Sequence, residues 1–126
     1  MSSARSVIVI DDEPELANLF NAFLIKEGYN VITFIDPVLA FEYFKKTSDK
    51  HSLIITDMRM PGLSGIDLAK RIREINSKIV IFLMTAFDIS DLKNQPDFKL
   101  ARIDMLIQKP VRFSYLREII HNIWET

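Results

Sequence analysis

Five side chains that could do chemistry together stand at or just beyond the ends of separate apolar runs. They are Asp11, Asp12, Asp57, Thr85 and Lys109. Short continuous runs rich in Val, Ile and Leu, alternating with helical patterns, are typical of parallel strands buried on both faces. The carboxyl ends of such strands share one edge of the sheet, where ligands bind. The sequence therefore predicts a crevice with three carboxylates, a hydroxyl and an ammonium group, which suits a divalent cation and a phosphoryl group.

The adjacent acids Asp11 and Asp12 would repel each other unless a cation offset their charges. With Asp57 across the crevice they offer hard oxygen ligands, and a small site with open water positions suits Mg²⁺, with Mn²⁺ as the nearest substitute. The alternative is an acidic N-cap, in which Asp12 or Glu13 satisfies the first amides of the following helix. One acid can cap while the other binds metal, so the sequence leaves both interpretations open.

Asp57, Lys109 and Thr85 each have a reactive and an ordinary interpretation. A carboxylate such as Asp57 can attack phosphorus to give an acyl phosphate, although an aspartate after a strand more often begins a turn. Lys109 can reach a phosphoryl oxygen as a point charge, or form a salt bridge to Asp57, and both fit the unphosphorylated state. The Thr85 hydroxyl can bind a phosphoryl oxygen or cap a helix.

The elements that must position these side chains follow from the hydrophobic pattern. Apolar runs predict five strands, at 6–11, 30–34, 52–56, 78–84 and 104–108. Helical spacing predicts helices from Pro14 to near Gly28, from Pro37 onward, over 65–74 and over 113–124. This alternation predicts an α/β doubly wound sandwich with right-handed crossovers.

The stretch 88–103 gives the weakest pattern in the chain. Residues 88–94 suit a short helix, Pro96 should break or bend it, and residues 98–103 suit a resumed helical turn. We therefore expect an interrupted helix before the last strand.

Composition excludes several classes of function. The 126 residues are 48% apolar and 26% charged, as expected for one folded domain. The absence of cysteine excludes disulfides and thiolate chemistry, and the two histidines, His51 and His121, lie in different segments, which argues against zinc. A net charge of −1 argues against direct nucleic-acid binding. No apolar run has the length of a membrane span, so we expect a cytoplasmic protein without membrane insertion.

Taken together, the motifs resemble the receiver domain of two-component response regulators, the CheY-like family. The matching residues are Asp11-Asp12, the stretch 57–65 that reads DMRMPGLSG, Thr85-Ala86 and Lys109-Pro110. The resemblance covers residues 6–124, with every motif in order. It implies a flavodoxin-like (βα)5 fold, a five-stranded parallel sheet of order 2-1-3-4-5, and one receiver domain over residues 1–126 that stands alone without an output domain.

The resemblance also implies a role for each site residue. Asp57 would accept a phosphoryl group from a histidine kinase or a histidine phosphotransfer protein. Mg²⁺ would be bound by Asp12 and Asp57, by the backbone carbonyl of Arg59, and by Asp11 through water. The resemblance further implies that Thr85 reports phosphorylation and that Lys109 holds a phosphoryl oxygen. It also implies that the peptide bond before Pro110 is cis. Such a protein is a phosphoacceptor switch rather than an enzyme acting on other substrates.

Two positions depart from the family pattern. Leu106 stands where receivers usually have Tyr or Phe, which leaves no ring to move with the switch threonine. The interrupted stretch 88–104 replaces the usual fourth helix, so we expect the surface used by partners or for dimerisation to be remodelled or mobile. The chain is expected to be a monomer or a phosphorylation-dependent dimer. Arg59 and Phe87 border the path of the attacking water in the family, which suggests slow loss of the phosphoryl group.

Three other classes of function fit less well. A haloacid-dehalogenase-like phosphatase places a second aspartate two residues after its nucleophile, but Arg59 stands there. A flavin-binding protein of flavodoxin type needs a phosphate-binding loop after the first strand, where Asp11-Asp12 would repel phosphate. A degenerate receiver would have lost some of the motifs that this chain retains.

Overall fold

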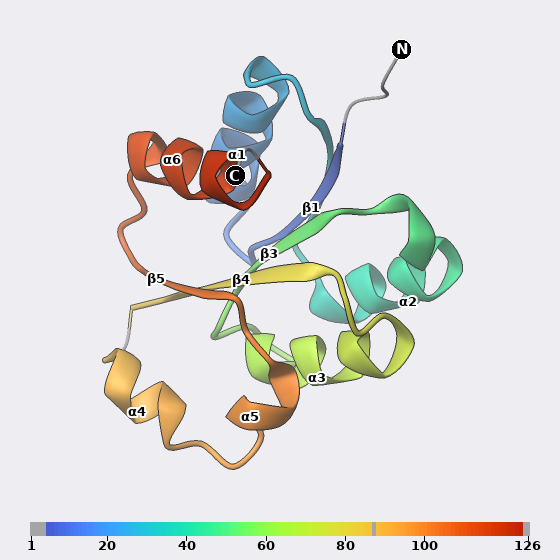
Figure 1. Cartoon of the computed structure of the whole chain (residues 1–126), viewed down its shortest axis with the longest axis vertical. Helices are drawn as coiled ribbons and strands as arrows, with labels where there is room; N and C mark the ends of the chain where they lie inside the picture. Colours follow the sequence, from blue (N-terminus) through green and yellow to red (C-terminus); the bar gives the residue numbers. More distant parts are fainter. Residues whose placement is uncertain (1–4, 87, 125–126) are drawn as a thin grey trace.

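The computed structural model describes residues 5–86 and 88–124, and its centre is a five-stranded parallel sheet of order β2-β1-β3-β4-β5 (Figure 1). This is the flavodoxin-like α/β sandwich and the strand order predicted from the sequence. The five strands are β1 (Ser6–Ile10), β2 (Asn30–Phe34), β3 (Leu53–Asp57), β4 (Val80–Thr85) and β5 (Met105–Gln108). Order 2-1-3-4-5 brings the carboxyl ends of β1, β3, β4 and β5 side by side.

Three strand ends differ from the prediction by one residue. Asp57 and Thr85 are the last residues of β3 and β4 rather than the first residues beyond them. Asp11 lies just beyond β1, although its amide still donates to the Phe34 carbonyl at 3.0 Å. Polar side chains can end a buried strand here because this edge of the sheet opens onto the crevice.

Helices cover both faces of the sheet. The four longer helices are α1 (Pro14–Lys26), α2 (Pro37–Thr47), α3 (Gly65–Ile75) and α6 (Phe113–Trp124), and a short 3-10 turn, Ser48–Lys50, follows α2. Figure 1 shows α1 and α6 on one face and α2 and α3 on the other. α1 begins with Pro14 in its first turn and ends before Gly28, which has a φ of +97° and continues the chain where most residues would be strained.

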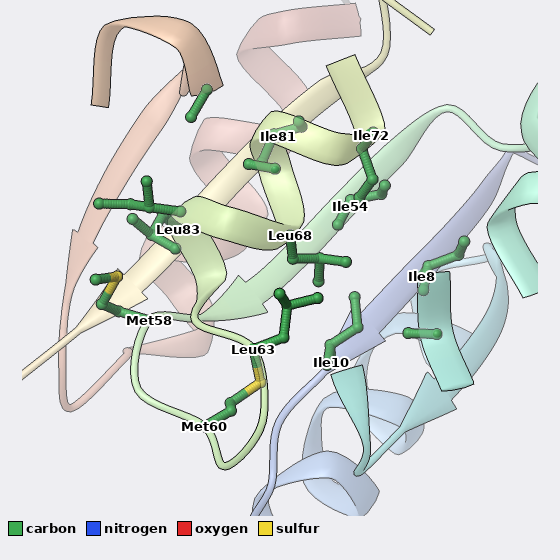
Figure 2. Packing of buried hydrophobic residues seen from close by; sticks show 14 of the residues in the cluster. Ile8, Ile10, Ile54, Met58, Met60, Leu63, Leu68, Ile72, Ile81 and Leu83 are labelled. Carbon is green, nitrogen blue, oxygen red and sulfur yellow. The ribbon is translucent and has the colours of Figure 1, made fainter. Parts of the chain in front are cut away.

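Each face has its own apolar core. Alternate residues of each strand point to opposite faces, so Val7 and Val9 pack with Phe20 of α1, while Ile8 and Ile10 pack toward α2 and α3. Figure 2 shows the second core, in which Leu63 and Met60 of the loop after β3 join Leu68 of α3. The loop that carries the chemistry is therefore anchored in the larger core.

The stretch between β4 and β5 is an interrupted helix, as the position of Pro96 predicts. It contains α4 (Ile89–Lys93) and α5 (Phe98–Ala101). Asp88 is the N-cap of α4, and its carboxylate accepts from the Ser90 amide at 2.9 Å. α5 ends at Arg102, a non-glycine residue in the left-handed region with a φ of +45°.

No helix within residues 5–86 and 88–124 combines the length and the apolar character needed to cross a membrane.

Candidate functional site

Three carboxylates meet at the carboxyl edge of the sheet. Asp11 and Asp12 follow β1, and Asp57 ends β3 next to it. One oxygen from each of the three lies within 4.8 Å of the others. Asp11 and Asp57 are buried, whereas Asp12 is partly exposed at the mouth of the crevice. The predicted acidic cluster is thus brought together.

Asp57 is held by contacts to both of its carboxylate oxygens. Oδ1 accepts from the Met58 amide at 3.0 Å, and Oδ2 accepts from Lys109 Nζ at 3.0 Å. Burial raises the pKa of Asp57, and the hydrogen bond and charge of Lys109 oppose that rise only in part. The carboxylate is therefore oriented toward the crevice and poorly solvated.

Asp11 is completely buried, and one of its carboxylate oxygens makes no hydrogen bond to a described residue. Its Oδ1 accepts from the Glu13 amide at 3.0 Å at the start of α1. Its Oδ2 has no hydrogen-bond partner among the described residues, and Lys109 Nζ lies 3.7 Å away. Burial raises the pKa of Asp11. Glu13 is the N-cap of α1 but makes no capping hydrogen bond with its side chain, so the capping alternative is not seen for Glu13.

Lys109 joins the carboxylates from the end of β5. Its amide donates to the Thr85 carbonyl at 2.7 Å, which fixes the end of β5 against the end of β4. Burial lowers the pKa of Lys109, but the hydrogen bond and charge of Asp57 and the charge of Asp11 outweigh burial, so the pKa is raised. Lys109 is therefore fully charged at neutral pH. The peptide bond from Lys109 to Pro110 is cis.

Thr85 lies on β4, next to the strand that ends at Asp57, and Leu106 lies on β5, one strand further along the sheet. Thr85 is the buried last residue of β4, and Asp88 rather than Thr85 is the N-cap of α4, which excludes the capping interpretation of Thr85 for that helix. Leu106 is in β5, half-buried against the core on the α3 face.

The crevice is an open pocket of about 380 Å³ beside these groups. It is lined by Asp12, Glu13, Asp57, Met58, Arg59, Thr85, Ala86 and Lys109. Arg59 is exposed at its rim, and Phe87 lies outside the described residues. Five of the predicted site residues line this pocket: Asp12, Asp57, Arg59, Thr85 and Lys109. Asp11 is not part of the lining but its Oδ2 lies 3.7 Å from Lys109 Nζ, Pro110 follows Lys109, and Leu106 is in the body of β5.

Gly65 positions the acceptor loop in a way that sequence reasoning did not assign. Its amide donates to the Met58 carbonyl at 2.7 Å, and the Met58 amide donates to the Met84 carbonyl at 2.8 Å. A Cβ at Gly65 would collide with the Asp57 carbonyl oxygen and with the Leu83 side chain. A glycine eight residues beyond the strand-end aspartate was the available signal.

Comparisons with known proteins agree with this geometry. Residues 7–121 match the response regulator receiver domain family. The chain is 29% identical to the response regulator receiver protein CpdR of Brucella abortus, over 94% of this chain and 93% of that protein. It is 28% identical to the 3′,5′-cyclic-nucleotide phosphodiesterase regA of Dictyostelium discoideum, but spans only 16% of that protein.

Solved structures give the same result. Response regulator TrrA of Thermotoga maritima, in complex with Mg²⁺ and BeF, has a TM-score of 0.79 and 29% identity, with coverage of 94% of this chain and 98% of that one. CheY from Borrelia burgdorferi, in a CheX–CheY complex, has a TM-score of 0.86 at 19% identity, with coverage of 97% and 90%, and shows the shared fold.

This chain belongs to the response regulator receiver domain family of two-component systems. Members of the family are phosphoacceptor switches rather than enzymes in the usual sense. The family assignment replaces the hydrolase and flavoprotein alternatives.

Proposed function

We propose that Asp57 accepts a phosphoryl group from a phosphohistidine of a histidine kinase or a histidine phosphotransfer protein, and that this transfer switches partner binding. The observation that carries the proposal is the pairing of the Asp57 carboxylate with Lys109 beside two further carboxylates. This arrangement combines a nucleophile, a fixed cation and a set of hard oxygen ligands in one open pocket.

The reaction is a displacement at phosphorus. One carboxylate oxygen of Asp57 forms the new P–O bond, and the P–N bond of the donor breaks with its electron pair returning to the histidine ring nitrogen. The product is an aspartyl phosphate and a neutral histidine. Lys109, already 3.0 Å from Oδ2, would move to a phosphoryl oxygen, and the Thr85 hydroxyl would donate a hydrogen bond to another.

The residues fit Mg²⁺ as the resident cofactor, with Mn²⁺ as a substitute. Asp12 and Asp57 would bind it directly, with the backbone carbonyl of Arg59, and Asp11 would act through water. The buried Oδ2 of Asp11, which makes no hydrogen bond to a described residue, supports this assignment, because such a carboxylate oxygen calls for a cation or an ordered water. When bound, the ion would neutralise charge on the transferring phosphoryl group.

The protein donor would approach over an apolar groove next to the site. This groove, of about 470 Å³, shares Glu13, Ala86 and Lys109 with the pocket. It is otherwise lined by apolar residues of α1, of the loop after β5 and of the start of α6. Leu19 on its wall is 53% exposed, which suits contact with an apolar face of a partner. We propose cytoplasmic action, either as a monomer or as a dimer that forms on phosphorylation.

Intact-mass measurement after incubation with acetyl phosphate or phosphoramidate tests the proposal. We expect one added phosphoryl group that requires Mg²⁺, is absent in Asp57→Asn and is retained in Asp49→Asn, a matched change of an exposed aspartate. An adduct that persists in Asp57→Asn would contradict the assignment. No adduct with either donor, and no beryllofluoride binding, would indicate a degenerate receiver.

A further inference from the structure

A buried arginine contacts three segments near the amino ends of β4 and β5, at the opposite edge of the sheet from the phosphoacceptor pocket. Arg73 of α3 is only 8% exposed. Its guanidinium group donates to the carbonyls of Ser77, Ile79, Ala101 and Arg102 and to the carboxylate of Asp104. The distance from Arg73 to Asp104 Oδ2 is 3.0 Å. The planar fork of arginine is the side chain able to satisfy so many acceptors at once.

Asp104 connects Arg73 to strand β4 of the sheet. It is the residue immediately before β5, and its amide donates to the Ile81 carbonyl at 2.9 Å. Its Oδ2 accepts from the Ile81 amide at 2.8 Å as well as from Arg73. Asp104 therefore closes the first pair of hydrogen bonds between β4 and β5, and Figure 1 shows β5 starting there beside α5 and α3.

Strand β5 needs such an anchor because its own side chains define its register only weakly. It has four residues, lies at the edge of the sheet and pairs with β4 alone. Three of its residues are apolar in sequence, and both faces are covered: Met105 and Ile107 pack on one core and Leu106 on the other. A slip by one residue would still leave apolar side chains on both faces, so the hydrophobic pattern does not exclude it.

The register of β5 decides where Lys109 lies. Lys109 follows β5 directly and reaches Asp57 at 3.0 Å. A slip by one residue would move it by about 3.3 Å along the strand and turn its side chain to the other face. Its contact with Asp57 would then be lost.

We infer that Arg73, acting through Asp104, is a positioning residue for Lys109: it sets the register of β5 and thereby the placement of the lysine in the phosphoryl site. This inference rests on the proposed function of Asp57 and Lys109. The anchor lies at the opposite end of the strand from the chemistry, and within the described part of the chain Arg73 makes no hydrogen bond or ion pair with a site residue.

Beryllofluoride with Mg²⁺, bound to the intact chain, is the probe of the phosphoryl site. In Arg73→Met and in Asp104→Ala we expect beryllofluoride affinity to fall roughly tenfold or more, since one hydrogen bond to a charged group is lost. The affinity for Mg²⁺ alone should stay the same or rise, because Lys109 no longer competes for the carboxylates. Asp104→Asn keeps an oxygen that can accept from the Ile81 amide, so its beryllofluoride affinity should stay close to that of the wild type.

A second measurement reads the register directly. In the wild type, NMR should place Leu83 opposite Leu106 and Met84 opposite Ile107, and in the two disruptive variants these cross-strand contacts should shift or disappear. The control is Leu24→Ala, which removes a fully buried side chain from α1 without touching the anchor and should leave both the register and the ratio of the two affinities unchanged.

The outcomes separate the two proposals. Folded Arg73→Met and Asp104→Ala proteins with wild-type register and wild-type beryllofluoride affinity would overturn the inference. Equal losses of Mg²⁺ and beryllofluoride binding, matched by Leu24→Ala, would overturn it as well, because they indicate general destabilisation. If the wild type binds no beryllofluoride, the proposed function fails, and the NMR register alone still decides the role of Arg73.

Discussion

Replacing Lys109 by methionine should make the protein less stable without Mg²⁺ and more dependent on it. Lys109 Nζ lies 3.0 Å from Asp57 Oδ2 and 3.7 Å from Asp11 Oδ2. At an effective dielectric constant of about 20, each attraction amounts to about 5 kcal/mol before desolvation. The lysine side chain is 19% exposed, and the carboxylates can take up protons when the lysine is lost. We therefore expect a net loss of about 2–3 kcal/mol at pH 7.

Mg²⁺ should reverse this loss. The ammonium group occupies the same carboxylates that would bind the ion, so its removal should tighten Mg²⁺ binding about fivefold to tenfold. A ligand present at about 100 times its dissociation constant stabilises the native state by about 2.7 kcal/mol. Mg²⁺ at that level should therefore return Lys109→Met close to the stability that the wild type has in EDTA. Because the wild type binds Mg²⁺ too, the two proteins at the same saturating Mg²⁺ should still differ, but by about 1–1.4 kcal/mol less than in EDTA.

The assay is urea unfolding followed by far-UV circular dichroism, first with EDTA and then across a Mg²⁺ titration. The control is Lys70→Met, since Lys70 pairs with Asp97 at 3.5 Å where both side chains are about two-fifths exposed. Its change should stay below about 1 kcal/mol and should not respond to Mg²⁺. A Lys109→Met protein as stable as the wild type in EDTA, or one that binds Mg²⁺ more weakly, would refute the reasoning.

Three further predictions concern single positions. Gly65→Ala should lower the free energy of unfolding by about 1–3 kcal/mol or more and abolish phosphorylation, because the new Cβ collides with the Asp57 carbonyl. The control Gly28→Ala places its Cβ where no atom lies within 4 Å, so it should lose stability only through its positive φ. Urea unfolding and intact mass check both variants. Burial lowers the pKa of His51, so the stability it contributes is complete above pH 6.5 and is lost as the pH falls through the folded pKa; urea midpoints at pH 7.5 and 5.5 should differ less in His51→Asn than in the wild type. Leu92→Ala removes the one buried side chain of α4, so hydrogen exchange at 89–93 should lose protection while β4 keeps it.

The sequence predicted the site because the physics of parallel sheets gathers strand ends. Asp57, Thr85 and Lys109 are far apart in the chain, yet each ends or follows a buried strand, and such ends share one edge. The strand order required the resemblance to a family, since periodicity gives the elements but not their neighbours. The roles of these residues stay predictions until phosphorylation is measured.

The sequence could not predict the role of Arg73. On α3 the apolar spacing identifies Ile66, Ala69 and Ile72 as the inward face, and an arginine next to them suggests an exposed position. Its acceptors at Ala101 and Asp104 lie 28 and 31 residues further along the chain. Every residue has a backbone carbonyl, whatever its type. A buried side chain whose acceptors are mostly backbone carbonyls therefore leaves no recognisable pattern in the sequence.

The two halves of the interrupted segment between β4 and β5 are held in place by different contacts. Its C-terminal part is fixed by Arg73 and by buried Ala101, which are contacts to α3. Its N-terminal part, α4, has five residues and is held by one buried leucine and an aspartate cap. A single turn of helix contributes little stability of its own, because helix nucleation is unfavourable and few hydrogen bonds follow it. Helix α4, the part of this segment that follows Thr85, is therefore the part that a change at the phosphoryl site could rearrange at the least cost in free energy, while β5 and Lys109 keep their positions.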